Sequence, residues 1–149
     1  MKICLPTSSG GHLTHLMQLR SLWDGHDRFW VTFDKEDANS RLIGECVYHC
    51  HYPTNRNLKN LLRNTALAIK VLRMERPDLI VSTGAAVAVP FFVVGRLLGA
   101  KTVYIEIIDR MDSATLTGKL VYRFTDIFVV QWPEMTKVYP KAVCLGSVF

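Results

Sequence analysis

Short apolar runs alternate with helix-forming segments along the whole chain, and this alternation limits the possible folds more than any other feature. It is typical of βαβ units, in which parallel strands are joined by helices. Strands are expected at residues 2–5, 29–33, 46–49, 79–82, 102–106, 127–130 and 142–145, and helices at 13–22, 37–44, 58–75, 87–98, 116–124 and 134–139. The pattern predicts one α/β domain, residues 1–149, with a Rossmann-like, mainly parallel sheet.

Composition narrows the class of protein further. Hydrophobic residues make up 49% of the 149 positions, which excludes a disordered or fibrous chain. The longest stretch without charge, residues 79–95, contains serine, threonine, glycine and proline and is shorter than the roughly 20 residues that span a bilayer. The four cysteines are widely spaced and lack a second pair of metal ligands, so we expect free thiols, no metal site, no cofactor and a reducing compartment.

A glycine loop between the first strand and the first helix is the first candidate site. Ser9, Gly10 and Gly11 precede His12, and helix starts of this kind favour anions. We expect the three small residues to bind substrate and His12 to act as a general base. The alternative is an ordinary turn in which Ser9 caps the helix and His12 is a surface residue.

Two further loops follow predicted strands, whose carboxyl ends form the usual ligand edge of such sheets. Thr83 and Gly84 begin a second small-residue turn, which lines the cleft or merely permits close helix packing. Glu106 ends the fifth strand as a second candidate base, and Arg110 and Ser113 follow as candidate substrate ligands. The alternative is a simple ion pair between Arg110 and a neighbouring carboxylate.

The helix expected at residues 58–75 carries most of the net charge of +5. Residues 56–76 hold six basic residues and one acid. At 100° per residue, one helix face combines basic and apolar side chains, a pattern of helices that lie on anionic bilayers: Lys59, Arg63, Leu67, Lys70 and Met74. The core face is expected to hold Leu58, Leu61, Leu62, Ile69 and Leu72. No nucleic-acid motif accompanies this charge, so nucleic acid is not an expected partner.

The second half of the chain contains a specific series of motifs. It carries VYIE at 103–106, then Arg110, LTGKLVY at 116–122, DIFVVQWP at 126–133, YPKA at 139–142 and Gly146. This series, together with the glycine loop and the Thr83-Gly84 turn, resembles the asparagine-linked-glycosylation-fourteen-like family. Members of that family are acceptor-side, membrane-associated subunits of split UDP-sugar glycosyltransferases.

The resemblance implies half of a GT-B enzyme, equivalent to its N-terminal domain, with a second chain supplying the donor-binding half. It implies an inverting transfer of a hexose from a UDP-sugar to a polyprenyl-diphosphate-linked sugar, at the cytoplasmic face of the membrane. It places the glycine loop and His12 at the cleft between the two halves. The transmembrane anchor of eukaryotic relatives is not found, which favours a bacterial member in exopolysaccharide or capsule synthesis, attached peripherally. The alternative is a non-catalytic recruiter that docks the donor-binding subunit at the membrane.

Overall fold

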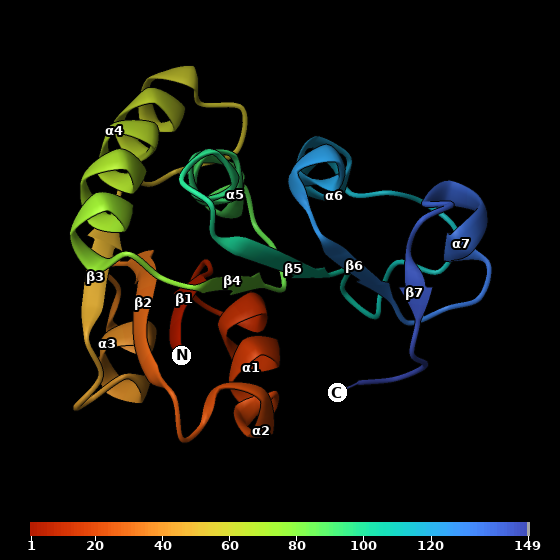
Figure 1. Cartoon of the computed structure of the whole chain (residues 1–149), viewed down its shortest axis with the longest axis horizontal. Helices are drawn as coiled ribbons and strands as arrows, with labels where there is room; N and C mark the ends of the chain where they lie inside the picture. The colour runs from red at the N-terminus through yellow and green to blue at the C-terminus, as the bar shows by residue number, and fades with distance from the viewer. Residues whose placement is uncertain (149) are drawn as a thin grey trace.

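The computed structural model describes residues 1–148, which form one α/β domain around a seven-stranded sheet. All neighbouring strands run parallel, in the order β3-β2-β1-β4-β5-β6-β7 (Figure 1). The strands are β1 (Lys2–Pro6), β2 (Asp27–Phe33), β3 (Val47–Cys50), β4 (Leu79–Ser82), β5 (Lys101–Ile105), β6 (Ile127–Val130) and β7 (Val143–Cys144). The Rossmann-like α/β prediction is confirmed.

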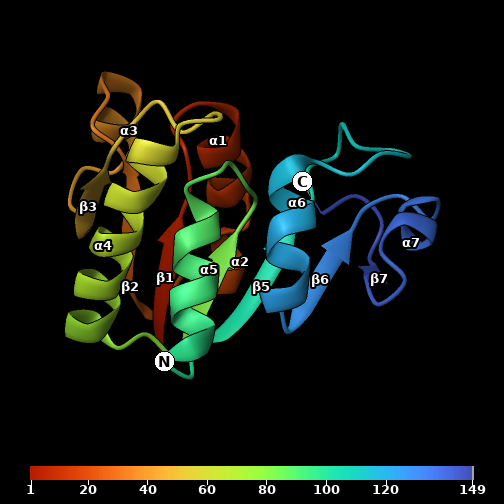
Figure 2. The same ribbon diagram turned by 90° about the horizontal axis from the view of Figure 1, so that it is seen from above.

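Helices cover both faces of the sheet, as Figures 1 and 2 show. One face carries α1 (Gly11–Gln18), α2 (Arg20–Trp23) and α3 (Glu36–Arg41), and the other carries α4 (Leu58–Glu75), α5 (Ala88–Leu97) and α6 (Leu116–Val121). The 3-10 turn η1 (Tyr122–Phe124) follows α6, and α7 (Met135–Val138) lies beside β7. Each face has its own apolar cluster, because parallel strands bury side chains on both sides.

The helix expected at residues 13–22 is divided in two. Leu19 leaves the helical conformation, with φ −82° and ψ 29°, and α2 begins at the next residue. The buried indole of Trp23 donates to the backbone carbonyl of Leu16 at 2.9 Å, which satisfies one of the acceptors that the end of α1 leaves free. A side chain seven residues away thus stabilises a break that helical periodicity does not indicate.

The prediction for the core face of α4 is wrong. Of the five residues expected on that face, four are exposed and only Leu72 is buried. The buried face instead consists of Asn60, Asn64, Ala68, Val71 and Leu72. Leu67 is half-buried and packs against the core, so it does not belong to the exposed face.

The rotation of α4 has a polar cause. The side chains of Asn60 and Asn64 point inward and bond to the backbone of the segment before the helix, at Pro53 and His51. Asn60 and Asn64 are themselves buried, and buried amide side chains need such partners. The exposed face therefore combines the basic residues with more apolar side chains than expected: Lys59, Arg63, Lys70, Arg73, Leu58, Leu61, Leu62, Ile69 and Met74.

Within residues 1–148, no helix has both the length and the apolar character needed to cross a bilayer. The long helix α4 alternates polar and apolar side chains, and the apolar helix α5 has only 10 residues.

Candidate functional site

The sheet reverses its strand order between β1 and β4, which are neighbours in the sheet but far apart in the chain. Ligands of Rossmann-like domains bind at the carboxyl edge of such a switch point. Here the glycine loop after β1 meets the turn after β4. The structure thus brings His12 and Thr83, which are 71 positions apart, into direct contact.

Two hydrogen bonds fix His12 against the β4 turn. The Nδ1 atom of His12 lies 3.0 Å from the carbonyl oxygen of Thr83, and the Thr83 hydroxyl donates to the carbonyl oxygen of His12 at 2.9 Å. A carbonyl oxygen only accepts, so Nδ1 carries the proton and Nε2 keeps its lone pair. The ring is therefore oriented and presented as a base at Nε2.

Gly84 lies directly beneath the imidazole. A Cβ atom at this position would be 2.8 Å from Cε1 of His12 and 3.2 Å from the hydroxyl oxygen of Tyr104. The φ angle of +120° also favours glycine. The Ser82 hydroxyl donates to the carbonyl of Pro6 at 2.6 Å and accepts from the Gly84 amide at 3.1 Å, which joins the ends of β1 and β4. Gly84 thus has a packing role under His12.

The surroundings of His12 lower its pKa below the ordinary value of 6.5. Partial burial is the largest cause, because it disfavours the charged imidazolium. The Thr83 carbonyl and the charge of Asp109 act in the opposite direction, and His15 adds to the lowering. The net effect keeps Nε2 unprotonated at neutral pH.

The start of α1 has no side-chain cap. Gly10 occupies the N-cap position with φ +79°, and no side chain caps this end, so the alternative with a Ser9 cap is wrong. The Gly10 amide donates to Oδ2 of Asp37, from α3, at 2.8 Å. Sequence reasoning missed Asp37, because no spacing rule connects positions 10 and 37. Ser9 is half-buried and Gly11 is exposed at the same edge.

Glu106 lies in a closed set of hydrogen bonds and is only 1% exposed. Its carboxylate accepts from the Thr115 hydroxyl at 3.0 and 3.1 Å and from the Tyr139 hydroxyl at 3.1 Å. Thr115 caps α6 through the amide of Gly118 at 2.9 Å. Burial raises the pKa of Glu106, and these hydroxyl groups oppose the shift. The contacts favour a role in holding α6 and the preceding loop, and a role as base stays a prediction.

Arg110 and Ser113 are exposed on the loop after β5, which reaches outward on the side of α7 (Figure 2). The indole of Trp132 donates to the carbonyl of Ile108 at 2.6 Å and anchors this loop to the end of β6. Within residues 1–148, no ion pair joins Arg110 to Glu106 or Asp109. The structure does not bring these two candidates against His12, and their roles stay predictions.

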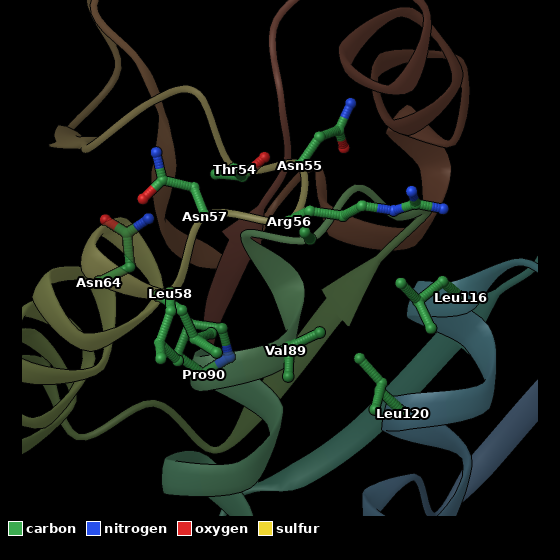
Figure 3. Close-up of a pocket in the computed structure, with 12 residues that line it drawn as sticks. Thr54, Asn55, Arg56, Asn57, Leu58, Asn64, Val89, Pro90, Leu116 and Leu120 are labelled. Atoms are coloured by element: carbon green, nitrogen blue, oxygen red, sulfur yellow. The ribbon is translucent and has the colours of Figure 1, made fainter.

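An apolar hollow of about 640 Å³ opens beside the same edge, between α4, α5 and α6 (Figure 3). Polar residues 54–57 lie at its mouth, and leucine, valine and proline side chains form its walls. Sequence reasoning missed this hollow, because its walls come from three helices. In the part of the chain that the structure describes, no group of three His, Cys, Asp or Glu side chains could hold a metal ion.

A family model described as "Oligosaccharide biosynthesis protein Alg14 like" matches residues 53–148. The chain belongs to this family. The UDP-N-acetylglucosamine transferase subunit ALG14 of Rattus norvegicus is 38% identical, and the match covers 98% of this chain and 82% of that protein. The Homo sapiens subunit of the same name is 27% identical, over 99% and 83% of the two chains.

Solved structures show the same fold at low sequence identity. MurG from Acinetobacter baumannii matches with a TM-score of 0.73 at 18% identity, and the match covers 89% of this chain and 42% of that chain. The UDP-GlcNAc 2-epimerase from Methanocaldococcus jannaschii matches with a TM-score of 0.75 at 13% identity, over 99% and 46%. The chain thus spans less than half the length of these structures, as expected for one half of a GT-B fold.

These comparisons correct two expectations. The relatives named ALG14 come from animals and fungi, so the comparisons do not support a bacterial polysaccharide type of member. They are named as subunits of a UDP-N-acetylglucosamine transferase, so the expected transfer of a hexose in exopolysaccharide or capsule synthesis is wrong. A role as a transferase subunit is supported.

Proposed function

We propose that this chain is the acceptor-side subunit of a two-chain UDP-N-acetylglucosamine transferase. The names of its relatives support this donor class. The relatives are named as subunits of that transferase, which supports a partner subunit that supplies the donor-binding half. The acceptor in this proposal is a sugar linked to a polyprenyl diphosphate.

The orientation of His12 is the observation that carries the proposal. With Nδ1–H donated to Thr83 and a lowered pKa, Nε2 is free to accept a proton at neutral pH. In an inverting transfer, Nε2 takes the proton of the acceptor hydroxyl, and the hydroxyl oxygen forms a bond to C1 of N-acetylglucosamine. The bond between C1 and the phosphate oxygen breaks, and UDP leaves with the electron pair.

Other groups at the edge support the same reaction. The start of α1 carries a partial positive charge, which favours the diphosphate of the donor near Ser9 and Gly11. Asp37 already accepts from the Gly10 amide, so this amide is not one of the groups proposed to bind the diphosphate. Thr83 and Gly84 hold the base from below. Arg110 and Ser113 are proposed to reach substrate from the loop after β5.

Membrane attachment is proposed to use the exposed face of α4. Basic and apolar side chains alternate there, which suits a helix that lies on an anionic bilayer. The proposed attachment is peripheral and cytoplasmic. Leu58 and Leu62 are 69% and 64% exposed, so the face offers apolar contacts as well as charge.

The test is a reconstitution with the donor-binding subunit that copurifies with this chain. Transfer of labelled N-acetylglucosamine from its UDP donor to a prenyl-diphosphate-linked sugar is measured for the pair and for each chain alone. We expect activity only from the pair, and a loss of about 10²-fold or more in kcat for His12→Gln. Full activity from one chain, or unchanged turnover by the intact His12→Gln pair, contradicts the proposal.

A further inference from the structure

The hollow between α4, α5 and α6 is an apolar groove with a polar mouth, and the function proposed above does not use it. Its walls are the side chains of Leu58 and Leu61 on α4, Val89 and Pro90 on α5, and Leu116 and Leu120 on α6. Leu116 is 63% exposed. The volume of the groove, about 640 Å³, lies in the range of small-molecule sites.

The mouth of the groove carries a cation. Figure 3 shows the Arg56 side chain crossing the top of the groove toward α6, where Leu116 lies. The backbone of Arg56 has φ 48°, a left-handed conformation that non-glycine residues rarely adopt. A planar guanidinium above an apolar groove fits the anionic head of an amphipathic ligand.

The segment that carries Arg56 is held in place by asparagines. Asn57 caps α4 by accepting from the amide of Asn60 at 2.9 Å, and the Asn60 side chain donates to the carbonyl of Pro53 at 2.9 Å. Asn64 binds both backbone groups of His51, at 2.8 and 2.9 Å. These bonds explain why α4 turns polar side chains inward, and they form the mouth of the groove in a fixed shape.

The groove begins close to the proposed base. Ala86 lines it and lies two residues after Gly84, which contacts the His12 ring. At its other side, Leu58 and Leu61 belong both to the wall and to the exposed face of α4. The groove therefore extends from the turn under His12 to the exposed face of α4, and Arg56 lies at its mouth. A prenyl-linked acceptor likewise combines a sugar, an anionic diphosphate and an apolar isoprenoid chain.

We infer that this groove binds the first isoprene units of a polyprenyl diphosphate, with Arg56 on the diphosphate. The inference rests on the proposed function for the identity of the acceptor, and on the groove itself for the lipid. In this proposal the chain recognises the lipid of the acceptor, in addition to binding the membrane surface. The groove thereby aligns the acceptor sugar with His12.

The test is calorimetric titration of the full chain with farnesyl diphosphate, farnesol and inorganic diphosphate. We expect farnesyl diphosphate to bind more tightly than either fragment. Val89→Trp fills the groove and should weaken this binding more than tenfold, since even one misplaced methylene in an apolar pocket costs about tenfold. Leu97→Trp is the matched control, on the same helix but 79% exposed and outside the groove, and should bind normally.

A second variant and a crosslink keep the test independent of folding defects. Leu120 is 49% exposed, so Leu120→Trp narrows the groove with little risk to the core. A farnesyl diphosphate with a diazirine should label residues 58–61, 86–90 and 116–120. Unchanged affinity in both groove variants, or labelling confined to other parts of the chain, overturns the inference. Crosslinks between the groove and an apolar segment of the partner subunit, which would show that the partner occupies the groove, also overturn it.

Different results would contradict the inference about the groove and the proposed function. Transfer of N-acetylglucosamine that is equal in the parent and Val89→Trp pairs, for long and short prenyl acceptors alike, overturns the groove and leaves the function standing. Loss of farnesyl diphosphate binding in Val89→Trp, with no N-acetylglucosamine transfer by any pair, overturns the function and leaves the groove as a lipid-diphosphate site.

Discussion

Replacing Gly84 by alanine perturbs the support of His12 without touching the imidazole itself. The new Cβ would lie 2.8 Å from Cε1 of His12, so the ring has to move by roughly 0.7 Å to restore a carbon–carbon contact of about 3.5 Å. A displacement of about 1 Å in a catalytic group can lower the rate about 10²-fold. We expect a loss of that size in kcat/KM of the reconstituted pair.

The same substitution also strains the backbone. At φ +120°, an alanine costs on the order of 1–3 kcal/mol, which corresponds to a fall in Tm of about 3–9 °C for a chain of this size. Gly99→Ala is the matched control, because Gly99 has φ +91° and nothing lies within 4 Å of its added Cβ. This control should lower Tm by a similar mechanism and leave turnover near the parent value.

Two assays separate the effects. Circular dichroism of the chain gives Tm for both variants, and transfer of labelled N-acetylglucosamine by the reconstituted pair gives kcat/KM. Turnover of Gly84→Ala within about twofold of the parent would refute the reasoning that the ring position is set by contact with the β4 turn. An equal loss of turnover in Gly99→Ala would attribute the effect to stability alone.

Three further predictions concern protonation, the buried carboxylate and the membrane. Because burial lowers the pKa of His12 and the base acts unprotonated, kcat/KM should rise with pH through a value below 6.5 and stay level at neutral pH; an acid limb above 6.5 contradicts this. Glu106→Gln should retain most turnover while Glu106→Ala lowers stability by about 2–4 kcal/mol in thermal unfolding, since it leaves two hydroxyl groups without their acceptor; a loss of about 10²-fold in Glu106→Gln would instead indicate a base. A triple charge reversal on α4 should abolish cosedimentation with anionic vesicles and salt-sensitive binding, and binding that survives it contradicts a basic membrane face: Lys59→Glu, Arg63→Glu and Lys70→Glu.

Much of the fold could be predicted because its signals are local. The strands at Leu79–Ser82 and Ile127–Val130 and the helix at Leu58–Glu75 have the expected bounds, since apolar runs and helical periodicity are written in neighbouring residues. The loops that carry His12 and Thr83 were expected at the same sheet edge for the same reason. Their contact through Nδ1 and a carbonyl was not, because it joins residues 71 positions apart.

The orientation of α4 could not be predicted from its own side chains. A helical wheel places leucines inward, as hydrophobicity alone favours. The side chains of Asn60 and Asn64 instead bond to the backbone of His51 and Pro53, and these bonds satisfy the two amides in their buried positions. This tertiary requirement turns Leu58 and Leu61 outward, where they become one wall of the groove.

Local patterns in the sequence are enough to predict the α/β architecture, most strands and helices and the residues at the carboxyl edge. They do not predict the break between α1 and α2, nor which residues of that edge contact one another. Tertiary packing joins His12 to Thr83 by a hydrogen bond, and it surrounds Glu106 with Thr115 and Tyr139. It also forms a groove from three helices. Hydrogen bonds and cavities between distant segments depend on how the chain packs in space, and no spacing along the sequence records them.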